Sequence, residues 1–217
     1  MMTASNSVSV VTTTWNEREN IEKLVSTIKN VLQQVQHEII VVDDTSPDGT
    51  FQIAKRVADL AITKPREGQT KGLLYGMRLA KYPTIITIDA DLENDPALIP
   101  SLIQQTSKFD IVVVCRTRLP RISEKIASKT LGKLVGVTDT LSNFRAYRKD
   151  IVPRFNLKGG ETFGAEFLVI AKKNGLKIGQ ITYEPPLRRR NPRIGGTMKA
   201  NARILWALIK SLIIYIS

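Results

Sequence analysis

The chain has 217 residues, 42% of them hydrophobic, which is enough to bury one good core as a single large domain or as a domain with an appendage. Its only cysteine, Cys115, excludes an internal disulfide. Its only histidine, His37, argues against a histidine-rich zinc or iron site and leaves Ser-His-Asp catalysis possible only if His37 is the base. No basic and apolar signal pattern opens the sequence, so we expect a reducing, cytosolic setting.

Charge is divided unevenly along the chain, whose formal net charge is +12 at pH 7. Residues 1–115 carry 11 Lys and Arg against 14 Asp and Glu, whereas residues 116–217 carry 21 against 6. The basic character therefore belongs almost wholly to the second half. Such a half predicts a polyanionic partner: nucleic acid, an anionic membrane surface or the phosphate groups of a substrate.

The first half alternates between strand-like and helix-like segments. A capping-box-like pair, Asn16 and Glu19, predicts that the first helix begins at residue 16 and runs to about residue 35. The expected strands are 8–15, 37–44, 60–64, 83–89 and 110–115, and the other expected helices are 51–59, 70–81 and one that starts around Pro96. This alternation predicts an α/β fold with a mostly parallel, doubly wound sheet covered by helices on both faces.

Beyond Cys115 the alternation is less regular. We expect a helix at 122–135, a strand within 139–149, a helix at 164–175, a strand at 176–185, a basic loop at 186–196 and a final helix at 198–217. The basic loop is predicted to be a mobile lid ordered by substrate, against the alternative of a solvated flexible loop. Lys125 and Lys129 share one face of the 122–135 helix and are candidates to meet an acceptor phosphate or lipid headgroups.

The final helix carries Lys199, Arg203 and Lys210 on one narrow stripe, while nearly all its other residues are apolar. Its apolar runs are far shorter than the ~20 residues that span a bilayer, so we expect it to lie in the membrane interface, with Trp206 and Tyr215 suited to that position. Two alternatives stay open. The helix packs only against the core, or the natural chain continues into membrane spans.

Acidic residues follow two of the expected strands. Asp43 and Asp44 end the second strand, and Asp89 and Asp91 end the fourth. Ligands of open parallel sheets bind at the carboxyl ends of the strands, and residues i and i+2 of extended chain point the same way, so Asp89 and Asp91 are expected side by side with Glu93 able to follow. Paired carboxylates suit magnesium or manganese. Asp95 is expected to cap the helix near Pro96 instead.

Three segments resemble motifs of the family 2 glycosyltransferases: "TTTWNERENI" at 12–21, "VVDDTSPDGT" at 41–50 and "IDADLENDP" at 88–96. Two further segments, Arg66 to Leu73 and "SNFRA" at 142–146, resemble the dolichyl-phosphate mannose synthase branch. The resemblance implies a GT-A fold over residues 1–200, with a nucleotide-sugar half at about 1–115, an acceptor half at about 116–200 and an interfacial or membrane-proximal helix at 201–217.

The resemblance also assigns roles to individual residues. It places a nucleoside pocket at Thr14, Trp15 and Glu17, the base or ribose beside Asp43 or Asp44, and the donor diphosphate and its metal at Asp89, Ala90, Asp91 and Glu93. It further implies phosphate contacts by Arg116 and the late Arg190 or Arg193, with Lys199 of the "GGTMK" segment as a further candidate. Lys71, at a helix start, is a candidate for a phosphate contact, with a solvated position as the equal alternative. Three positions depart from the family pattern. The family usually has Pro at the position of Thr13, Gln at that of Glu93 and Gly at that of Asn143. The change from Gln to Glu adds negative charge near the cation and leaves the metal preference open.

The implied activity is inverting, metal-dependent transfer of a hexose, most readily mannose from GDP-mannose, to a polyprenyl (dolichyl) phosphate at the cytosolic membrane face. A phosphate acceptor is already nucleophilic at neutral pH and needs no base, which fits the single histidine; Glu166 is only a weak candidate for a base. One alternative is another nucleotide sugar, such as UDP-glucose, with a glycan, protein or other lipid acceptor. A remote alternative is nucleic-acid binding, although no clustered aromatics accompany the arginine run.

Overall fold

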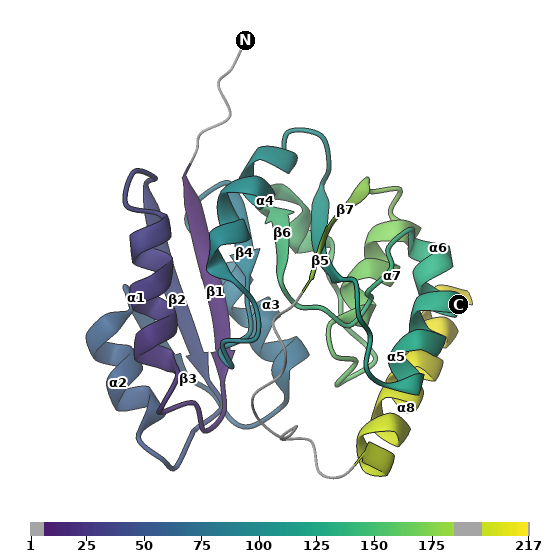
Figure 1. Ribbon diagram of the computed structural model, residues 1–217, viewed down its shortest axis with the longest axis horizontal. Helices are drawn as coiled ribbons and strands as arrows, with labels where there is room; N and C mark the ends of the chain where they lie inside the picture. The colour runs from purple at the N-terminus through teal and green to yellow at the C-terminus, as the bar shows by residue number, and fades with distance from the viewer. Residues whose placement is uncertain (1–6, 185–196, 217) are drawn as a thin grey trace.

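A seven-stranded sheet forms the centre of the molecule (Figure 1). The computed structural model describes residues 7–184 and 197–216. The strands are β1 (Val8–Thr14), β2 (His37–Asp43), β3 (Leu60–Thr63), β4 (Thr84–Thr87), β5 (Ile111–Arg116), β6 (Arg145–Arg148) and β7 (Ile178–Tyr183). They lie in the order β3-β2-β1-β4-β6-β5-β7, and only β6 runs antiparallel to its neighbours. The predicted mostly parallel α/β sheet is confirmed.

The two halves of the chain share this sheet. Strand β6, from the basic second half, lies between β4 and β5 of the first half, and β7 pairs with β5 in parallel. A ligand held at the ends of β1, β2 and β4 is therefore close in space to residues of both halves.

Helices cover both faces of the sheet, as predicted. The helical segments are α1 (Ile21–Val31), α2 (Thr50–Val57), α3 (Gln69–Leu79), η1 (Pro96–Leu98), α4 (Ile99–Gln105), α5 (Ile122–Ala127), η2 (Ser128–Gly132), α6 (Lys133–Val135), η3 (Lys149–Arg154), α7 (Ala165–Lys173) and α8 (Thr197–Ile216). Helices α1, α2 and α4 enclose one core, and α3, α7 and α8 enclose the other. Successive residues of β2 alternate between the two cores, with Ile39 and Val41 in the first and Ile40 and Val42 in the second.

The first helix begins five residues later than predicted. The backbone of Asn16 adopts a left-handed φ of 58°, and its amide donates a hydrogen bond to Ser46 Oγ. Helix α1 starts only at Ile21, because residues 17–20 form a turn whose amide at Glu17 donates to Thr50 Oγ1. The capping-box prediction for Asn16 and Glu19 is therefore wrong, and a contact with the second β–α connection decides this local conformation.

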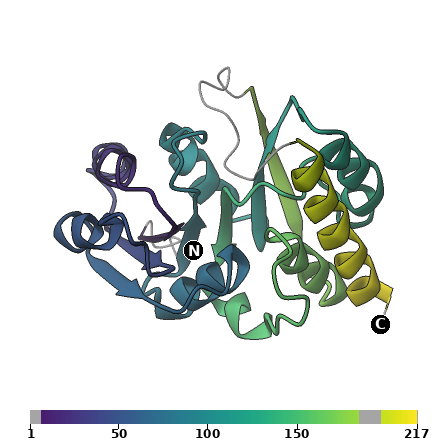
Figure 2. The ribbon, with the colours of Figure 1, turned by 90° about the horizontal axis from the view of Figure 1, so that it is seen from below.

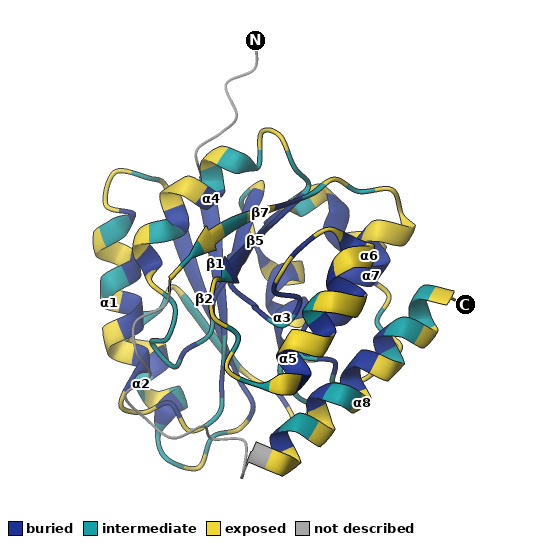
Figure 3. Cartoon of the chain, turned by 45° about the vertical axis from the view of Figure 1, so that its right-hand side comes forward, coloured by how far each residue is buried: buried dark blue, intermediate teal, exposed yellow. Residues whose placement is uncertain are grey.

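The C-terminal helix lies beside α5 and α7 at one edge of the molecule (Figure 2). Its inner side is buried through Ala200, Ile204, Ala207, Leu208 and Ser211, while much of its outer side is exposed (Figure 3). One face therefore packs on the domain, and the other is left to solvent. Across the described ranges, no helix has both the length and the apolar character needed to cross a membrane.

Candidate active site

A cleft of about 350 Å³ opens at the carboxyl ends of β1, β2 and β4. Its lining comes from five segments of the chain: Thr13, Thr14, Trp15 and Glu17 at and after the end of β1; Asp44 after β2; Arg66, Gly68 and Gln69 at the start of α3; Asp89, Ala90 and Asp91 after β4; and Glu161 and Phe163 before α7. The cleft therefore lies where the strand-end rule predicts a ligand site. Of the sequence-predicted residues, Thr14, Trp15, Glu17, Asp44, Asp89, Ala90 and Asp91 meet in this one cleft.

Asp89 and Asp91 form the acidic floor of the cleft. Strand β4 ends at Thr87, so both acids lie in the turn that follows it. Gln69 Nε2 donates a hydrogen bond to Asp89 Oδ1. Burial, together with the negative charge of Asp91, raises the pKa of Asp89 to about 7, although Gln69, Arg116 and Arg145 act in the opposite direction. Two carboxylates in this setting repel each other and favour a cation between them.

Glu93 does not join this pair as a third ligand in the structure. In the described part of the chain, no three Asp, Glu, His or Cys side chains are grouped closely enough to hold a metal ion by themselves. The extended geometry expected for residues 89–93 is wrong, because Leu92 has a left-handed φ of 62°. Asp91 Oδ1 instead accepts a hydrogen bond from the Glu93 amide at 3.1 Å.

The two acids that follow β2 have different roles. Asp43 is fully buried and accepts hydrogen bonds from Thr14 Oγ1 (2.7 Å) and from the amide and hydroxyl of Ser46 (2.7 and 2.6 Å). It therefore holds the β1 and β2 connections together. Asp44 lines the cleft and forms an ion pair with Lys64 at 2.6 Å. Of the two candidates for the base or ribose, Asp44 is the one that faces the cleft.

An aromatic and a cationic side chain form one wall of the cleft. The guanidinium of Arg66 lies over the ring of Trp15, 3.8 Å from its centroid. Arg66 is exposed, so the stack is held at the cleft mouth by this contact rather than by core packing. Trp15 thus contributes an aromatic ring to the cleft lining, with Arg66 stacked over one face of it.

Sequence reasoning gave no site role to Gln69, Glu161 or Phe163, which the tertiary structure brings into the cleft. Glu161 accepts hydrogen bonds from Thr70 Oγ1 (2.6 Å) and from the Phe163 amide (2.7 Å). The available signal was the "GGETFG" segment, in which glycines flank an acid and an aromatic residue. Glycines permit the left-handed conformations by which a loop brings polar groups close to a site.

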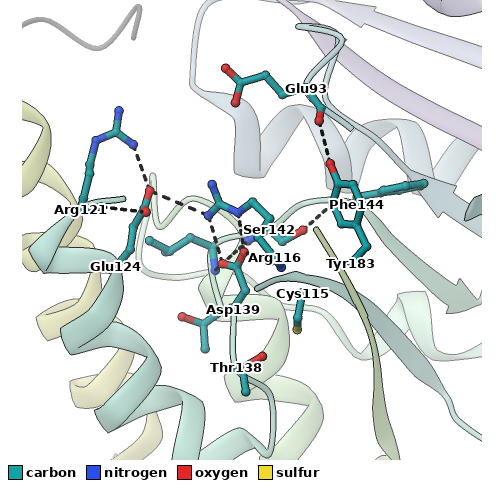
Figure 4. A network of polar contacts seen from close by, with 12 residues as sticks. Glu93, Cys115, Arg116, Arg121, Glu124, Thr138, Asp139, Ser142, Phe144 and Tyr183 are labelled. Carbon is teal, nitrogen blue, oxygen red and sulfur yellow. Dashed lines mark hydrogen bonds and ion pairs between the residues drawn. The ribbon is translucent and has the colours of Figure 1, made fainter. Parts of the chain in front are cut away.

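Arg116, at the end of β5, is held by an acidic network (Figure 4). Asp139 accepts from its Nε at 2.6 Å and from its Nη2 at 3.2 Å, and Glu124 lies 3.8 Å from Nη2. Glu124 also pairs with Arg121 at 3.0 Å. The two positive and two negative charges of this network compensate one another next to the cleft. The positive charge of Arg116 also acts to lower the pKa of Asp89. A fixed, two-point contact pre-orients this guanidinium.

The remaining predicted residues lie outside the cleft lining. Lys71 is exposed and pairs with Glu67 at 2.7 Å, and Lys199 is exposed on α8. Arg190 and Arg193, with the predicted lid, lie outside the described residues. Glu166 is fully buried and accepts from the Lys158 and Gly159 amides, so its role is structural. Asp95 caps η1 by accepting from the Ala97 amide, as predicted.

The arrangement fits a ligand that is aromatic at one end and anionic at the other. Trp15 and Asp44 offer stacking and hydrogen bonding in this cleft, and the acidic pair offers hard oxygen ligands. Asp89 and Asp91 fit a magnesium or manganese ion whose remaining ligands are phosphate oxygens and water, because such ions use one or two carboxylates plus substrate phosphates. A nucleoside diphosphate derivative has this distribution of groups.

Comparison with known proteins agrees with this arrangement. Residues 9–165 match the model of the family described as glycosyl transferase family 2. The chain is 30% identical, over 224 aligned residues, to a dolichol-phosphate mannosyltransferase of Pyrococcus furiosus, covering 94% of this chain and 64% of the relative. It is also 30% identical over 162 residues to an undecaprenyl-phosphate 4-deoxy-4-formamido-L-arabinose transferase of Pseudomonas fluorescens, covering 67% of this chain and 48% of the relative. The chain thus spans between about half and two thirds of the length of these relatives.

Solved structures agree on the fold. A glucosyl-3-phosphoglycerate synthase of Mycobacterium tuberculosis, in complex with Mn2+, UDP and glucosyl-3-phosphoglycerate, superposes with a TM-score of 0.78 at 20% identity, covering 95% of this chain and 80% of that one. A mannosyl-3-phosphoglycerate synthase of Rubrobacter xylanophilus gives a TM-score of 0.75 at 16% identity, covering 95% and 72%. The predicted GT-A-like fold is confirmed. The family match covers more than half of the residues, and the chain belongs to glycosyl transferase family 2.

Proposed function

We propose that this chain is an inverting, metal-dependent glycosyltransferase that moves a hexose from a nucleotide sugar to a polyprenyl phosphate. The observation that carries the proposal is the Asp89–Asp91 pair in a cleft that Trp15 and Asp44 also line. The similarity to two transferases named for polyprenyl-phosphate lipids supports the acceptor class.

Each group of residues has a distinct task in this proposal. Trp15, Thr14 and Glu17 hold the nucleoside together with Asp44, and Asp89 and Asp91 hold a magnesium or manganese ion on the diphosphate. The ion neutralises the charge that grows on the leaving diphosphate. Arg116 adds a fixed positive charge on the same side, so the departing group leaves into a region already arranged for anions.

The acceptor phosphate supplies its own nucleophile. A phosphate oxygen is anionic at neutral pH, so no side chain has to remove a proton before it attacks the sugar. The buried, structural role of Glu166 is consistent with this account. Arg190, Arg193, Lys71 and Lys199 stay proposed phosphate contacts, to be made when substrates bind.

Mannose from GDP-mannose is the donor we favour, because the relative from Pyrococcus furiosus is a mannosyltransferase. A UDP-sugar is the competing donor, since one superposed structure holds UDP with Mn2+. A thermal-shift screen of GDP-mannose and UDP-glucose, each with and without Mn2+, separates them, because a ligand of the native state raises the melting temperature. We expect a metal-dependent rise with one donor.

The decisive assay is transfer of radiolabelled sugar from the stabilising donor to an acceptor. We expect label in the lipid extract when a polyprenyl phosphate is supplied, and none with 3-phosphoglycerate, the acceptor portion of the product held by one superposed structure. Label found only on soluble acceptors contradicts the proposed lipid acceptor but remains consistent with glycosyltransferase activity. Absence of both a thermal shift and transfer contradicts the whole proposal.

An exposed apolar surface on α5, α6 and α8, here called the α5–α8 surface, is proposed to rest on an anionic membrane. Its apolar members are Ile122 (71% exposed), Ile126, Leu134, Met198 (86%), Trp206 (59%), Ile209, Ile213 and Ile216 (84%). The exposed cations Lys125, Lys129, Lys133, Lys199 and Arg203 accompany them. Apolar side chains beside cations match the acyl and headgroup layers of such a membrane. We place the enzyme on the cytosolic face, peripheral or anchored through α8.

Trp206 reports on this surface. The chain has two tryptophans, so Trp15→Phe leaves Trp206 as the only indole fluorophore. We expect its emission to shift to shorter wavelength when vesicles containing phosphatidylglycerol are added, and the shift to weaken with salt, because the cations contribute roughly 1 kcal/mol each near an anionic surface. Vesicles of neutral lipid serve as the control. An unchanged emission spectrum with both kinds of vesicle contradicts membrane docking through α8.

Manganese affinity should rise with pH until about pH 7. The pKa of Asp89 is raised to about 7 by burial and by Asp91, so below that pH the ion has to displace a proton from the carboxyl group. We expect the affinity to fall by up to about tenfold per pH unit below pH 7. Titration calorimetry in two buffers of different ionisation enthalpy detects the released proton. The same titration with Asp89→Asn should show weak, pH-independent binding; a flat profile for the unsubstituted protein contradicts the assignment.

A further inference from the structure

Lys210 is the one member of the predicted basic stripe whose ammonium turns into the protein. Its Nζ donates hydrogen bonds to the carbonyl oxygens of Gly159 (2.7 Å) and Glu161 (2.8 Å), while Lys199 and Arg203 are exposed. The stripe therefore does not act as one polar face. Lys210 connects α8, which carries much of the α5–α8 surface, to the loop of residues 158–164, which carries Glu161 and Phe163 into the cleft.

The 158–164 loop has a conformation that its own sequence does not favour. Three of its residues have left-handed backbone angles: Gly160 (φ 67°), Phe163 (φ 50°) and Gly164 (φ 75°). A non-glycine residue such as Phe163 adopts this region only when surrounding contacts hold it there. The loop therefore needs external anchors, and the structure supplies them from three helices.

The first two anchors come from α7 and α3. Glu166 accepts from the amides of Lys158 and Gly159 at the start of the loop. Thr70, fully buried at the start of α3, accepts from the amides of Thr162 and Gly164. These contacts fix the two ends of the loop, and Lys210 adds a third anchor at the carbonyl groups of Gly159 and Glu161.

The middle of the loop is tied to the acidic floor of the cleft. The carboxylate of Glu161 accepts from the amide and hydroxyl of Thr70, and it packs so closely on Gly68 that a side chain there would collide with it. The next residue along α3, Gln69, donates to Asp89. Three contacts therefore connect Lys210 to Asp89: Lys210 with the Glu161 carbonyl, the Glu161 carboxylate with Thr70, and Gln69, the residue before Thr70, with Asp89.

We propose that Lys210 is a positioning residue that couples α8 to the donor cleft by holding the 158–164 loop in its cleft-lining conformation. This inference rests on the proposed function and adds a form of regulation to it. Docking of α8 on a membrane restricts the helix, and Lys210 transmits that restriction to Glu161 and Phe163. The enzyme then binds its donor best where its lipid acceptor is found. Because coupling between two sites is reciprocal, nucleotide binding also strengthens docking.

The test compares Lys210→Met with Lys172→Met, which removes the same charge from an exposed lysine on α7. Methionine keeps an unbranched stem and a good helix propensity. The readout is hydrogen exchange of the amides of Thr162, Phe163 and Gly164. Those of Thr162 and Gly164 donate to Thr70 Oγ1 of α3, and that of Phe163 donates to the Glu161 carboxylate. This measurement needs no nucleotide, so its result is separate from the success or failure of the proposed function.

We expect Lys210→Met to speed exchange of these amides about tenfold or more, because a charge-assisted contact to two carbonyl groups is lost. Lys210→Arg should restore most of the protection, and Lys172→Met should leave it unchanged. Anionic vesicles should slow exchange in the unsubstituted protein but not in Lys210→Met, although both sediment equally with the vesicles. Glu161→Gln, which leaves Lys210 in place, should also speed exchange.

Two results overturn the proposal. One is unchanged exchange in Lys210→Met, which shows that the loop does not depend on this contact. The other is loss of vesicle binding in Lys210→Met to the same extent as loss of protection, which shows that the ammonium serves lipid directly. If Lys210→Met does not fold, Glu161→Gln and the vesicle effect in the unsubstituted protein decide. Nucleotide affinity, measured in parallel with Mn2+ and GDP or UDP, should weaken about tenfold in Lys210→Met.

Discussion

Asp91→Asn is expected to lower sugar transfer by at least about a hundredfold, because one of two carboxylates that hold the ion on the diphosphate becomes neutral. Asparagine keeps the oxygen that accepts from the Glu93 amide, so the turn after β4 is preserved. The melting temperature without metal should therefore change little or rise, since the repulsion between Asp89 and Asp91 is removed. Radiolabel transfer measures the loss of activity, and Mn2+ titration measures the loss of metal binding. Thermal unfolding without metal measures the melting temperature.

Asp95→Asn is the matched control for this experiment. It removes the same charge four residues further along the same acidic run. Asp95, however, is exposed, and its side chain caps η1. Asparagine caps helices about as well as aspartate, so both fold and transfer should be retained. Equal activity of Asp91→Asn and Asp95→Asn contradicts a metal role for Asp91, and equal loss in both shows only that net charge matters.

The largest effect on stability is expected for Arg145→Met, in strand β6. The guanidinium of Arg145 is fully buried and donates to the carbonyl oxygens of Ser142 (2.6 Å), Thr140 (2.9 Å) and Gly164 (2.7 Å), and to Tyr147 Oη (3.3 Å). Methionine leaves three carbonyl groups without these donors, and each buried unsatisfied group costs about 1–3 kcal/mol. We expect a loss of roughly 3–5 kcal/mol in the free energy of unfolding.

Arg148→Met, three residues along on the same strand, provides the comparison. Arg148 is 49% exposed by its side chain and pairs with Asp110 and Asp150, an arrangement in which ion pairs contribute about 0–1 kcal/mol. Urea unfolding of both variants should therefore separate them by several kcal/mol, and Arg145→Met should melt at least about 6 °C lower than Arg148→Met. Similar unfolding curves would show that water replaces the guanidinium at the three carbonyls.

The strand and helix pattern of the first half was determined by the sequence, and for a local reason. Strands such as β2 are buried on both faces and appear as continuous apolar runs, and their turns contain the glycine, proline and aspartate that such connections need. The strand-end rule then located the site, because acids placed after parallel strands must meet at one edge of the sheet. Asp89 and Asp91 follow from that reasoning alone, whereas the choice of Asp44 over Asp43 came from the structure.

Contacts between distant segments decided the rest. Asn16 failed as a helix cap because Ser46, thirty residues away, binds its amide. Leu92 turns the acidic run away from an extended path, so the spacing of Asp91 and Glu93 gave the wrong geometry. Local propensity contains no information on the contact between Asn16 and Ser46 or on the left-handed backbone of Leu92.

The sequence by itself determined the family, the sheet and the acids of the cleft, since each depends on patterns within a few neighbouring residues. Only the tertiary structure decided that β6 enters the sheet between β4 and β5, that Glu161 reaches α3, and that Lys210 turns inward from an otherwise exposed basic stripe. These features join residues separated by about thirty positions or more. Their stability comes from burial and hydrogen bonding that exist only once the chain has folded.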